Sequence, residues 1–138
     1  MSGSLVTCDS SVLISALRPT QQGHEACLEA VMSVTGVPVQ VLLEVYSVLT
    51  RLPGRERVPA QPLARELARL EWQPLQLPAD KHAAMLLKLS DAGVSGGSAY
   101  DAQIAITAKH HGYVLLSRDR RAARAYDAVG AAYELVGE

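Results

Sequence analysis

Four acidic residues stand at positions where side chains often do chemistry. Two of them come immediately after apolar runs that predict strands, one lies in the first turn of an Ala-rich predicted helix, and one lies in a narrow polar stripe of a helix that is otherwise apolar. In that order they are Asp9, Asp119, Asp101 and Glu44. Because the carboxyl ends of parallel strands meet at one edge of a sheet, we expect these four carboxylates to lie close together there.

A cluster of carboxylates needs a proton or a cation to be stable. Two such charges about 5 Å apart repel by roughly 3 kcal/mol at an effective dielectric of about 20. Ligation by carboxylate oxygens alone favours Mg2+ or Mn2+ over zinc, and Mg2+ usually keeps several of its waters. Hydrolysis of a phosphodiester by a metal-activated water is the reaction that such a site suits best. The pattern therefore predicts metal-dependent hydrolysis of phosphodiester bonds.

Each acid also has a purely structural explanation. Asp9 and Asp119 are suited to cap the helices that follow them, and Asp101 is suited to complete a capping box begun by Ser98. For Glu44 the alternative is a surface acid that faces solvent beside Arg51. These alternatives stay open for each residue taken alone, and the shared edge of the sheet is what favours a common site.

Apolar periodicity divides the chain into short strands and amphipathic helices. Gly36 and Pro38 are interpreted as punctuation before a helix, and Pro74 restricts its strand to the edge of a sheet. Alternating strands and helices predict an α/β fold in which a parallel sheet is covered by helices on both faces. We expect a single domain over residues 1–138. The predicted strands cover 5–8, 72–77, 113–116 and 132–136; the predicted helices follow Asp9 and Asp119 and also cover 24–32, 39–52, 62–70, 79–91 and 98–110.

The composition excludes several classes of protein. Hydrophobic residues make up 49% of the chain, which argues against disorder, and the absence of Phe means that Leu, Val, Ile and Ala must pack the core. Thirteen basic and fourteen acidic residues give a net charge of -1, so affinity for a polyanion must come from local patches. Cys8 and Cys27 lack metal-site spacing and are expected to be buried, reduced thiols. With no membrane span or signal segment in the pattern, we expect a cytoplasmic protein.

Four short motifs, in order along the chain, resemble those of the PIN-domain nucleases, and within that family the VapC-type toxins of bacterial type II toxin–antitoxin systems. The resemblance runs nearly end to end and is looser between Pro53 and Leu77. The motifs are Val6-Thr-Cys-Asp-Ser-Ser11, Leu43-Glu-Val-Tyr46, Ser98-Ala-Tyr-Asp-Ala-Gln-Ile-Ala105 and Leu115-Leu-Ser-Arg-Asp119.

This resemblance implies a PIN-like three-layer α/β/α sandwich with a central, mostly parallel sheet. It also implies an endoribonuclease that uses Mg2+, for which Mn2+ can substitute, and that is held inactive by a VapB-type antitoxin whose tail covers the active site. Members of the family usually form homodimers. By the same resemblance the metal-binding positions are Asp9, Glu44, Asp101 and Asp119, while Ser11 and Ser117, the latter in place of a commoner Thr, order the site.

A basic segment adjoins the last of the four acids. Arg118, Arg120, Arg121 and Arg124 are placed to meet a phosphate backbone that approaches the site, although a solvated helix face explains them equally well. A second basic rim is possible at Arg51, Arg55 and Arg57.

Two other functions fit the same fold. One is a PIN nuclease that processes RNA without an antitoxin, and the other is a catalytically silent interaction module that keeps only the fold and a partner surface. A serine nucleophile is disfavoured because no Gly-x-Ser-x-Gly turn is present. A phospho-aspartyl enzyme is disfavoured because Ser11 stands where such phosphatases need a second acid.

Overall fold

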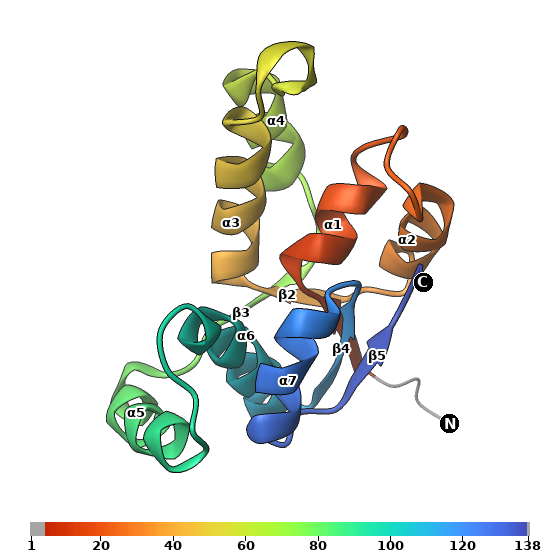
Figure 1. The fold of residues 1–138 in the computed structure, drawn as a ribbon. Helices are drawn as coiled ribbons and strands as arrows, with labels where there is room; N and C mark the ends of the chain where they lie inside the picture. The colour runs from red at the N-terminus through yellow and green to blue at the C-terminus, as the bar shows by residue number, and fades with distance from the viewer. Residues whose placement is uncertain (1–4, 138) are drawn as a thin grey trace.

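The computed structural model describes residues 5–137, and its elements alternate between short strands and helices (Figure 1). No helix in this range is long and apolar enough to cross a membrane. The strands are β1 (Leu5–Cys8), β2 (Gly36–Pro38), β3 (Gln73–Leu75), β4 (Tyr113–Ser117) and β5 (Tyr133–Leu135). The α-helices are α1 (Ser10–Ala16), α2 (His24–Val31), α3 (Val39–Thr50), α4 (Ala60–Ala68), α5 (His82–Asp91), α6 (Ser98–His110) and α7 (Arg120–Ala128), with single 3-10 turns at Gly54–Glu56 and Ala79–Lys81.

All strand pairs are parallel, as predicted from the alternating pattern. The central strand β4 lies between β1 and β5, with Leu5 beside Tyr113 and Leu115 beside Tyr133. Strands β2 and β3 form a second, two-stranded sheet, which lies beside β1 and is linked to it by a hydrogen bond from Thr35 N to Val6 O at 3.0 Å. The spatial order β3-β2-β1-β4-β5 reverses direction between β1 and β4. In doubly wound folds, ligand sites form outside the carboxyl ends of the strands at such a point.

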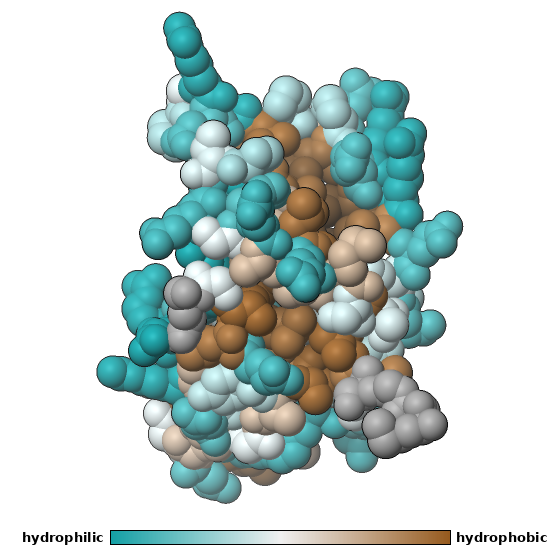
Figure 2. All heavy atoms as spheres, turned by 90° about the vertical axis from the view of Figure 1, so that its right-hand side faces the viewer, coloured by the Kyte–Doolittle hydropathy of each residue, from teal (hydrophilic) through white to brown (hydrophobic). Residues whose placement is uncertain are grey.

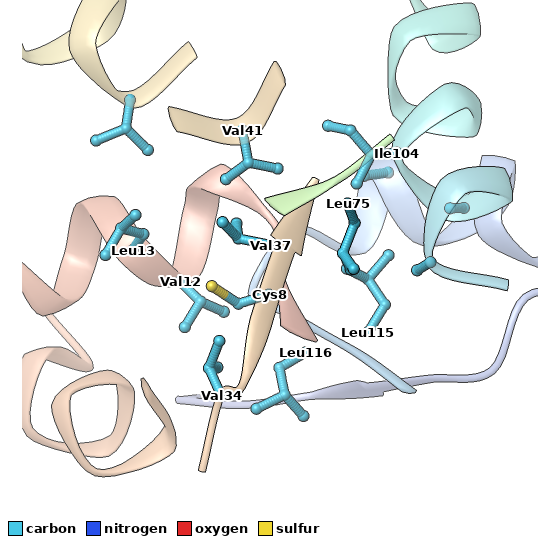
Figure 3. Close-up of a cluster of buried hydrophobic side chains, with 14 of the residues drawn as sticks. Cys8, Val12, Leu13, Val34, Val37, Val41, Leu75, Ile104, Leu115 and Leu116 are labelled. Atoms are coloured by element: carbon cyan, nitrogen blue, oxygen red, sulfur yellow. The ribbon is translucent and has the colours of Figure 1, made fainter. Parts of the chain in front are cut away.

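Helices cover both faces of the sheet, which gives the α/β sandwich that the sequence predicts. Figure 3 shows Val12 and Leu13 from α1 on one side of the strands and Ile104 from α6 on the other, with all three side chains buried. Neighbouring residues of β4 pack against the helix layers on both sides, because Leu115 and Leu116 are buried on opposite faces of the same strand. Aliphatic side chains dominate this core, as expected for a chain without Phe.

Strand β2 is an element that the sequence reading missed. Gly36 and Pro38 were interpreted as punctuation, yet both lie in a fully buried three-residue strand. A Cβ atom on Gly36 would lie 2.7 Å from the hydroxyl oxygen of Tyr113, so glycine is needed for the aromatic ring to cross the strand. Pro74 behaves as predicted, since β3 pairs only with β2 among the described strands and forms an edge.

Candidate active site

Asp9 is the most buried of the four predicted acids, with 3% of its surface exposed. The backbone continues the β1 ladder through Asp9 N to Leu116 O at 3.0 Å, and then turns into α1. The side chain caps that helix: Oδ1 accepts hydrogen bonds from Ser11 N (3.0 Å), Ser11 Oγ (2.5 Å) and Val12 N (3.4 Å). Burial raises the pKa of Asp9, and these donors act in the opposite direction by stabilising the carboxylate.

The other carboxylate oxygen of Asp9 is held from the opposite side of the site. Oδ2 accepts hydrogen bonds from Ser117 Oγ at 2.5 Å and Tyr126 OH at 2.6 Å. Ser117 Oγ also accepts from Asp119 N at 3.1 Å, and Ser11 Oγ accepts from Arg118 N at 2.9 Å. The two serines therefore connect the end of β1 to the end of β4 and fix the position of the first acid.

The remaining three acids come from three different helices. Asp119 caps α7, with Oδ1 accepting from Arg121 N at 2.9 Å and Ala122 N at 3.4 Å. Asp101 lies in the first turn of α6, where Gly97 is the capping residue and no side chain caps the helix, so the capping box with Ser98 does not form. Glu44 lies on α3 and accepts a hydrogen bond from Ser10 Oγ, so it does not simply face solvent beside Arg51.

The negative charges of the other three acids all act on the carboxyl group of Asp101. Its pKa is raised from an ordinary 3.8 to about 6, first by burial and then by the negative charges of Glu44, Asp119 and Asp9, while Arg121 lowers it. A carboxyl group with such a shifted pKa in a cleft is a common mark of a functional site. The structure therefore brings the four predicted carboxylates into one electrostatic cluster.

An open cavity of about 480 Å³ adjoins this cluster. Glu44, Asp101 and Asp119 line it together with Ser10, Arg51 and Tyr100, whereas Asp9 lies behind the lining residues. Three acids from α3, α6 and the start of α7 thus face one space that is large enough for a phosphate group and water.

The donor set of this cavity fits a divalent cation that is bound partly through water. Within residues 5–137 no three acidic, His or Cys side chains are placed to hold one ion directly between them. Mg2+ commonly uses one or two protein carboxylates and keeps the rest of its waters, and oxygen donors with unbalanced negative charge are the ligands it prefers. Glu44, Asp101 and Asp119 supply such donors, and Asp9 adds negative charge at the base of the site.

The four arginines after β4 do not act as a group. Arg118 is directed away from the cavity: its Nη2 donates to Gly137 O at 3.3 Å, and its Nε would lie 2.6 Å from a Cβ on Gly23. Arg121 lies beside the acids, with Nε 3.7 Å from Asp119 Oδ1. Arg120 and Arg124 have exposed positions on α7.

Of the second predicted rim, Arg51 lines the cavity, and its Nη1 donates to Ser47 Oγ at 3.3 Å. Arg57 instead donates to Leu52 O at 2.9 Å. The rim beside the cavity therefore consists of Arg51, while Arg55 and Arg57 lie in the segment between α3 and α4.

Two residues of the site were not found by sequence reasoning. Tyr126 is a buried residue of α7 whose hydroxyl reaches Asp9 from 117 positions further along the chain. Ser10 was not predicted to order the site, although its hydroxyl donates to Glu44. Local sequence carries no signal for either contact, because each depends on how α7 and α3 pack around the end of β1.

Comparison with known proteins assigns the fold to a family. The sequence model of the PIN domain matches residues 6–128. The chain belongs to the PIN-domain family. Ribonuclease VapC40 from Mycobacterium tuberculosis is 34% identical over 133 residues, which are 96% of this chain and 99% of that protein. Ribonuclease VapC27 from the same species is 34% identical over 128 residues, which are 88% of this chain and 90% of the relative.

Two solved structures share the architecture of this PIN domain. FitAcB from Neisseria gonorrhoeae superposes with a TM-score of 0.66 at 20% identity, over 94% of this chain and 96% of the other. FitAB bound to an IR36 DNA fragment gives a TM-score of 0.69 at 19% identity, over 97% and 96% of the two chains. At this identity the likeness concerns the fold alone.

Proposed function

We propose that this PIN domain is a Mg2+-dependent endoribonuclease toxin of a toxin–antitoxin pair. The observation that carries the proposal is the cavity lined by Glu44, Asp101 and Asp119 at the reversal point of the sheet, in a chain whose relatives are named ribonucleases. Mn2+ is expected to substitute for Mg2+, because both ions favour carboxylate oxygen.

In this proposal each residue has a separate task. A bound divalent ion supplies Lewis-acid stabilisation of the phosphate and a water of lowered pKa. Glu44, Asp101 and Asp119 would bind the ion partly through its retained waters, and the buried Asp9 contributes negative charge. Ser11, Ser117 and Tyr126 keep Asp9 in place through the hydrogen bonds described above.

Cleavage of RNA by the purified chain tests this function. We expect the wild-type chain to cut total or transfer RNA with Mg2+ or Mn2+ and to stop when EDTA is added. Asp9→Asn and Asp101→Asn should reduce the rate by a hundredfold or more, on the order of 3 kcal/mol of lost stabilisation. Asp80→Asn, an exposed acid outside the site, is the matched control. Equal cleavage in all samples, including EDTA, would refute the proposal.

An antitoxin of the VapB type and a second copy of the chain are the proposed protein partners. Large apolar side chains on α2 and at its C-cap are exposed, with Leu28 at 47% and Met32 at 82%. Figure 2 shows an apolar band between hydrophilic margins on the side of the molecule where α2 and β5 lie. Exposed apolar surface of this kind supports assembly with a partner.

Light scattering after size exclusion tests both partners. We expect a dimer mass for the chain alone, and a larger complex with loss of RNA cleavage when a VapB-type antitoxin encoded next to the chain is added. If the chain is a monomer and neither binds the antitoxin nor loses activity in its presence, the result would favour a PIN nuclease that acts without an antitoxin. We also expect the chain to be found in the cytoplasm, where fractionation of the source cells would locate it.

A further inference from the structure

The chain contains three lysines, and all three line one pocket away from the acidic cluster. Lys81 and Lys88 come from the segment that leads into α5 and from α5 itself, and Lys109 comes from the last turn of α6. The pocket has a volume of about 350 Å³ and is also lined by His110. No acidic side chain belongs to its lining, all of which falls within residues 5–137. A positively charged pocket of this kind is suited to bind an anion.

Lys88 and Lys109 lie beside each other, and neither forms an ion pair within residues 5–137. Partial burial, and then the hydrogen bond and positive charge of Lys109, lower the pKa of Lys88. Lys109 Nζ donates to Val129 O at 3.2 Å, so it is held in place by the backbone at the end of α7. Because like charges at short distance repel, an anion between the two ammonium groups would relieve this repulsion.

The pocket also has an apolar part. Leu77, Met85 and Ile106 line it together with the lysines. A ligand that matches both parts carries a phosphate next to a flat, weakly polar group, and a nucleotide of single-stranded RNA has this chemistry.

The lysine pocket and the acidic cavity each share lining residues with a hollow between them, and these three neighbouring hollows are together called the trough. Between them lies a third hollow of about 250 Å³, which shares Gln40, Leu43 and Gln103 with the acidic cavity and Leu77 with the lysine pocket. Helices α3, α6 and α5 follow one another along this path on the left of Figure 1. The lining residues thus change from acidic, through amide, to basic along one continuous surface.

The middle of the trough contains a hydrogen-bond acceptor without a partner. Gln40 Oε1 is buried and has no hydrogen-bond partner among the described residues. A buried polar atom left unpaired costs about 1–3 kcal/mol, so a donor from a bound ligand would be favourable there. Base amino groups and the ribose 2′-hydroxyl are such donors.

We propose that this trough binds a single-stranded stretch of the RNA substrate, with one backbone phosphate in the lysine pocket and the cleaved phosphate at the acidic cavity. The proposal rests on the proposed function and specifies how its substrate is held. Asp101 and Lys109 are eight positions apart on α6, or about 12 Å at ~1.5 Å per residue. At ~3.4 Å or more per nucleotide, at most about four nucleotides separate the two phosphates.

Fluorescence anisotropy with labelled RNA tests the proposal without any cleavage step. The Asp101→Asn chain is used with Mg2+, and binding of an unstructured eight-nucleotide RNA is compared with binding of a dinucleotide. Adding Lys88→Gln and Lys109→Gln should weaken binding of the longer RNA about tenfold. It should also reduce the salt slope by about 0.7, which corresponds to the one phosphate held in the lysine pocket. The dinucleotide should bind equally to both forms.

Arg65→Gln with Arg69→Gln is the matched control, because it removes two exposed positive charges from the region of α4. We expect this control to change the affinity less than twofold. We expect Gln40→Leu to weaken binding of the eight-nucleotide RNA and to leave binding of the dinucleotide unchanged. An equal loss in the arginine control, or no loss in the lysine variant, would overturn the proposal.

A change of oligomer mass in the lysine variant, with unchanged RNA affinity, would assign the trough to a second copy of the chain and would also overturn the proposal. Thermal unfolding of each variant confirms that it is folded. Failure of the wild-type chain to cut RNA would refute the proposed function instead, since binding is measured separately from cleavage.

Discussion

Neutralising Asp101 should stabilise the metal-free protein. Its pKa is raised to about 6, so the folded state disfavours the ionised carboxylate. A raised carboxyl pKa costs stability above the folded value, and this cost disappears as the pH falls from about 6 towards the unfolded value near 4. Asp101→Asn removes the charge and should therefore be more stable than wild type at pH 7.5 in EDTA.

The size of this effect follows from the pKa shift. About two pKa units correspond to roughly 3 kcal/mol, and because Asp101 is only half-buried, screening by solvent reduces the expected gain to about 1 kcal/mol. For a chain of this size that gain raises the melting temperature by about 4 °C. At pH 5, about midway between the unfolded and folded pKa values, the gain should fall to about half, and below about pH 4 it should nearly vanish because the carboxyl is then protonated in both states.

Differential scanning calorimetry in EDTA and in Mg2+ provides the assay. At a hundredfold excess over Kd, Mg2+ should stabilise wild type by ~3 kcal/mol and so raise its melting temperature, and it should raise that of Asp101→Asn much less. Asp80→Asn, which lies outside the cluster, should behave like wild type under every condition. An Asp101→Asn protein that is no more stable than wild type in EDTA at pH 7.5, or whose advantage persists unchanged at pH 5, would refute the electrostatic reasoning.

Three further predictions concern the residues around the site and the two buried cysteines. Tyr126→Phe removes a donor to the buried carboxylate of the first acid and should cost about 1–3 kcal/mol in urea unfolding, while Tyr133→Phe, at a less buried ring, should cost less. Ser117→Ala breaks the link between the ends of β1 and β4 and should slow RNA cleavage about tenfold or more in a gel assay without unfolding the protein. Burial raises the pKa of the Cys8 and Cys27 thiols, so neither should react with a thiol reagent at pH 8 until the chain unfolds.

Local patterns were sufficient to predict most of the fold. Apolar runs such as Tyr113–Leu116 and the helical spacing around Ala102 and Ala105 depend on neighbours in sequence, and they gave the right elements. Strand β2 was missed because its buried pairing depends on Tyr113 crossing over Gly36, a contact between residues far apart in the chain.

The sequence was sufficient to predict the four acids of the site, but not the residues that contact them. The positions of Asp9 and Asp119 at strand ends follow from the prediction of a parallel sheet. Both residues also cap the helices that follow them, so helix capping and membership of the acidic cluster are compatible. The direction of Arg118 was not predictable, because adjacent residues at the end of β4 point to different sides of the sheet. Sequence spacing likewise contains no information on which oxygen of Asp9 meets Tyr126.

Binding of Mn2+ to the acidic cluster tests the central claim most directly. Isothermal titration calorimetry with the wild-type chain, Asp101→Asn and Asp80→Asn compares the site with a matched acid outside it. We expect saturable binding to wild type and to Asp80→Asn, and affinity at least tenfold weaker for Asp101→Asn. Absence of Mn2+ binding to the wild-type chain, or equal affinity in all three proteins, would contradict the account and favour a catalytically silent PIN domain.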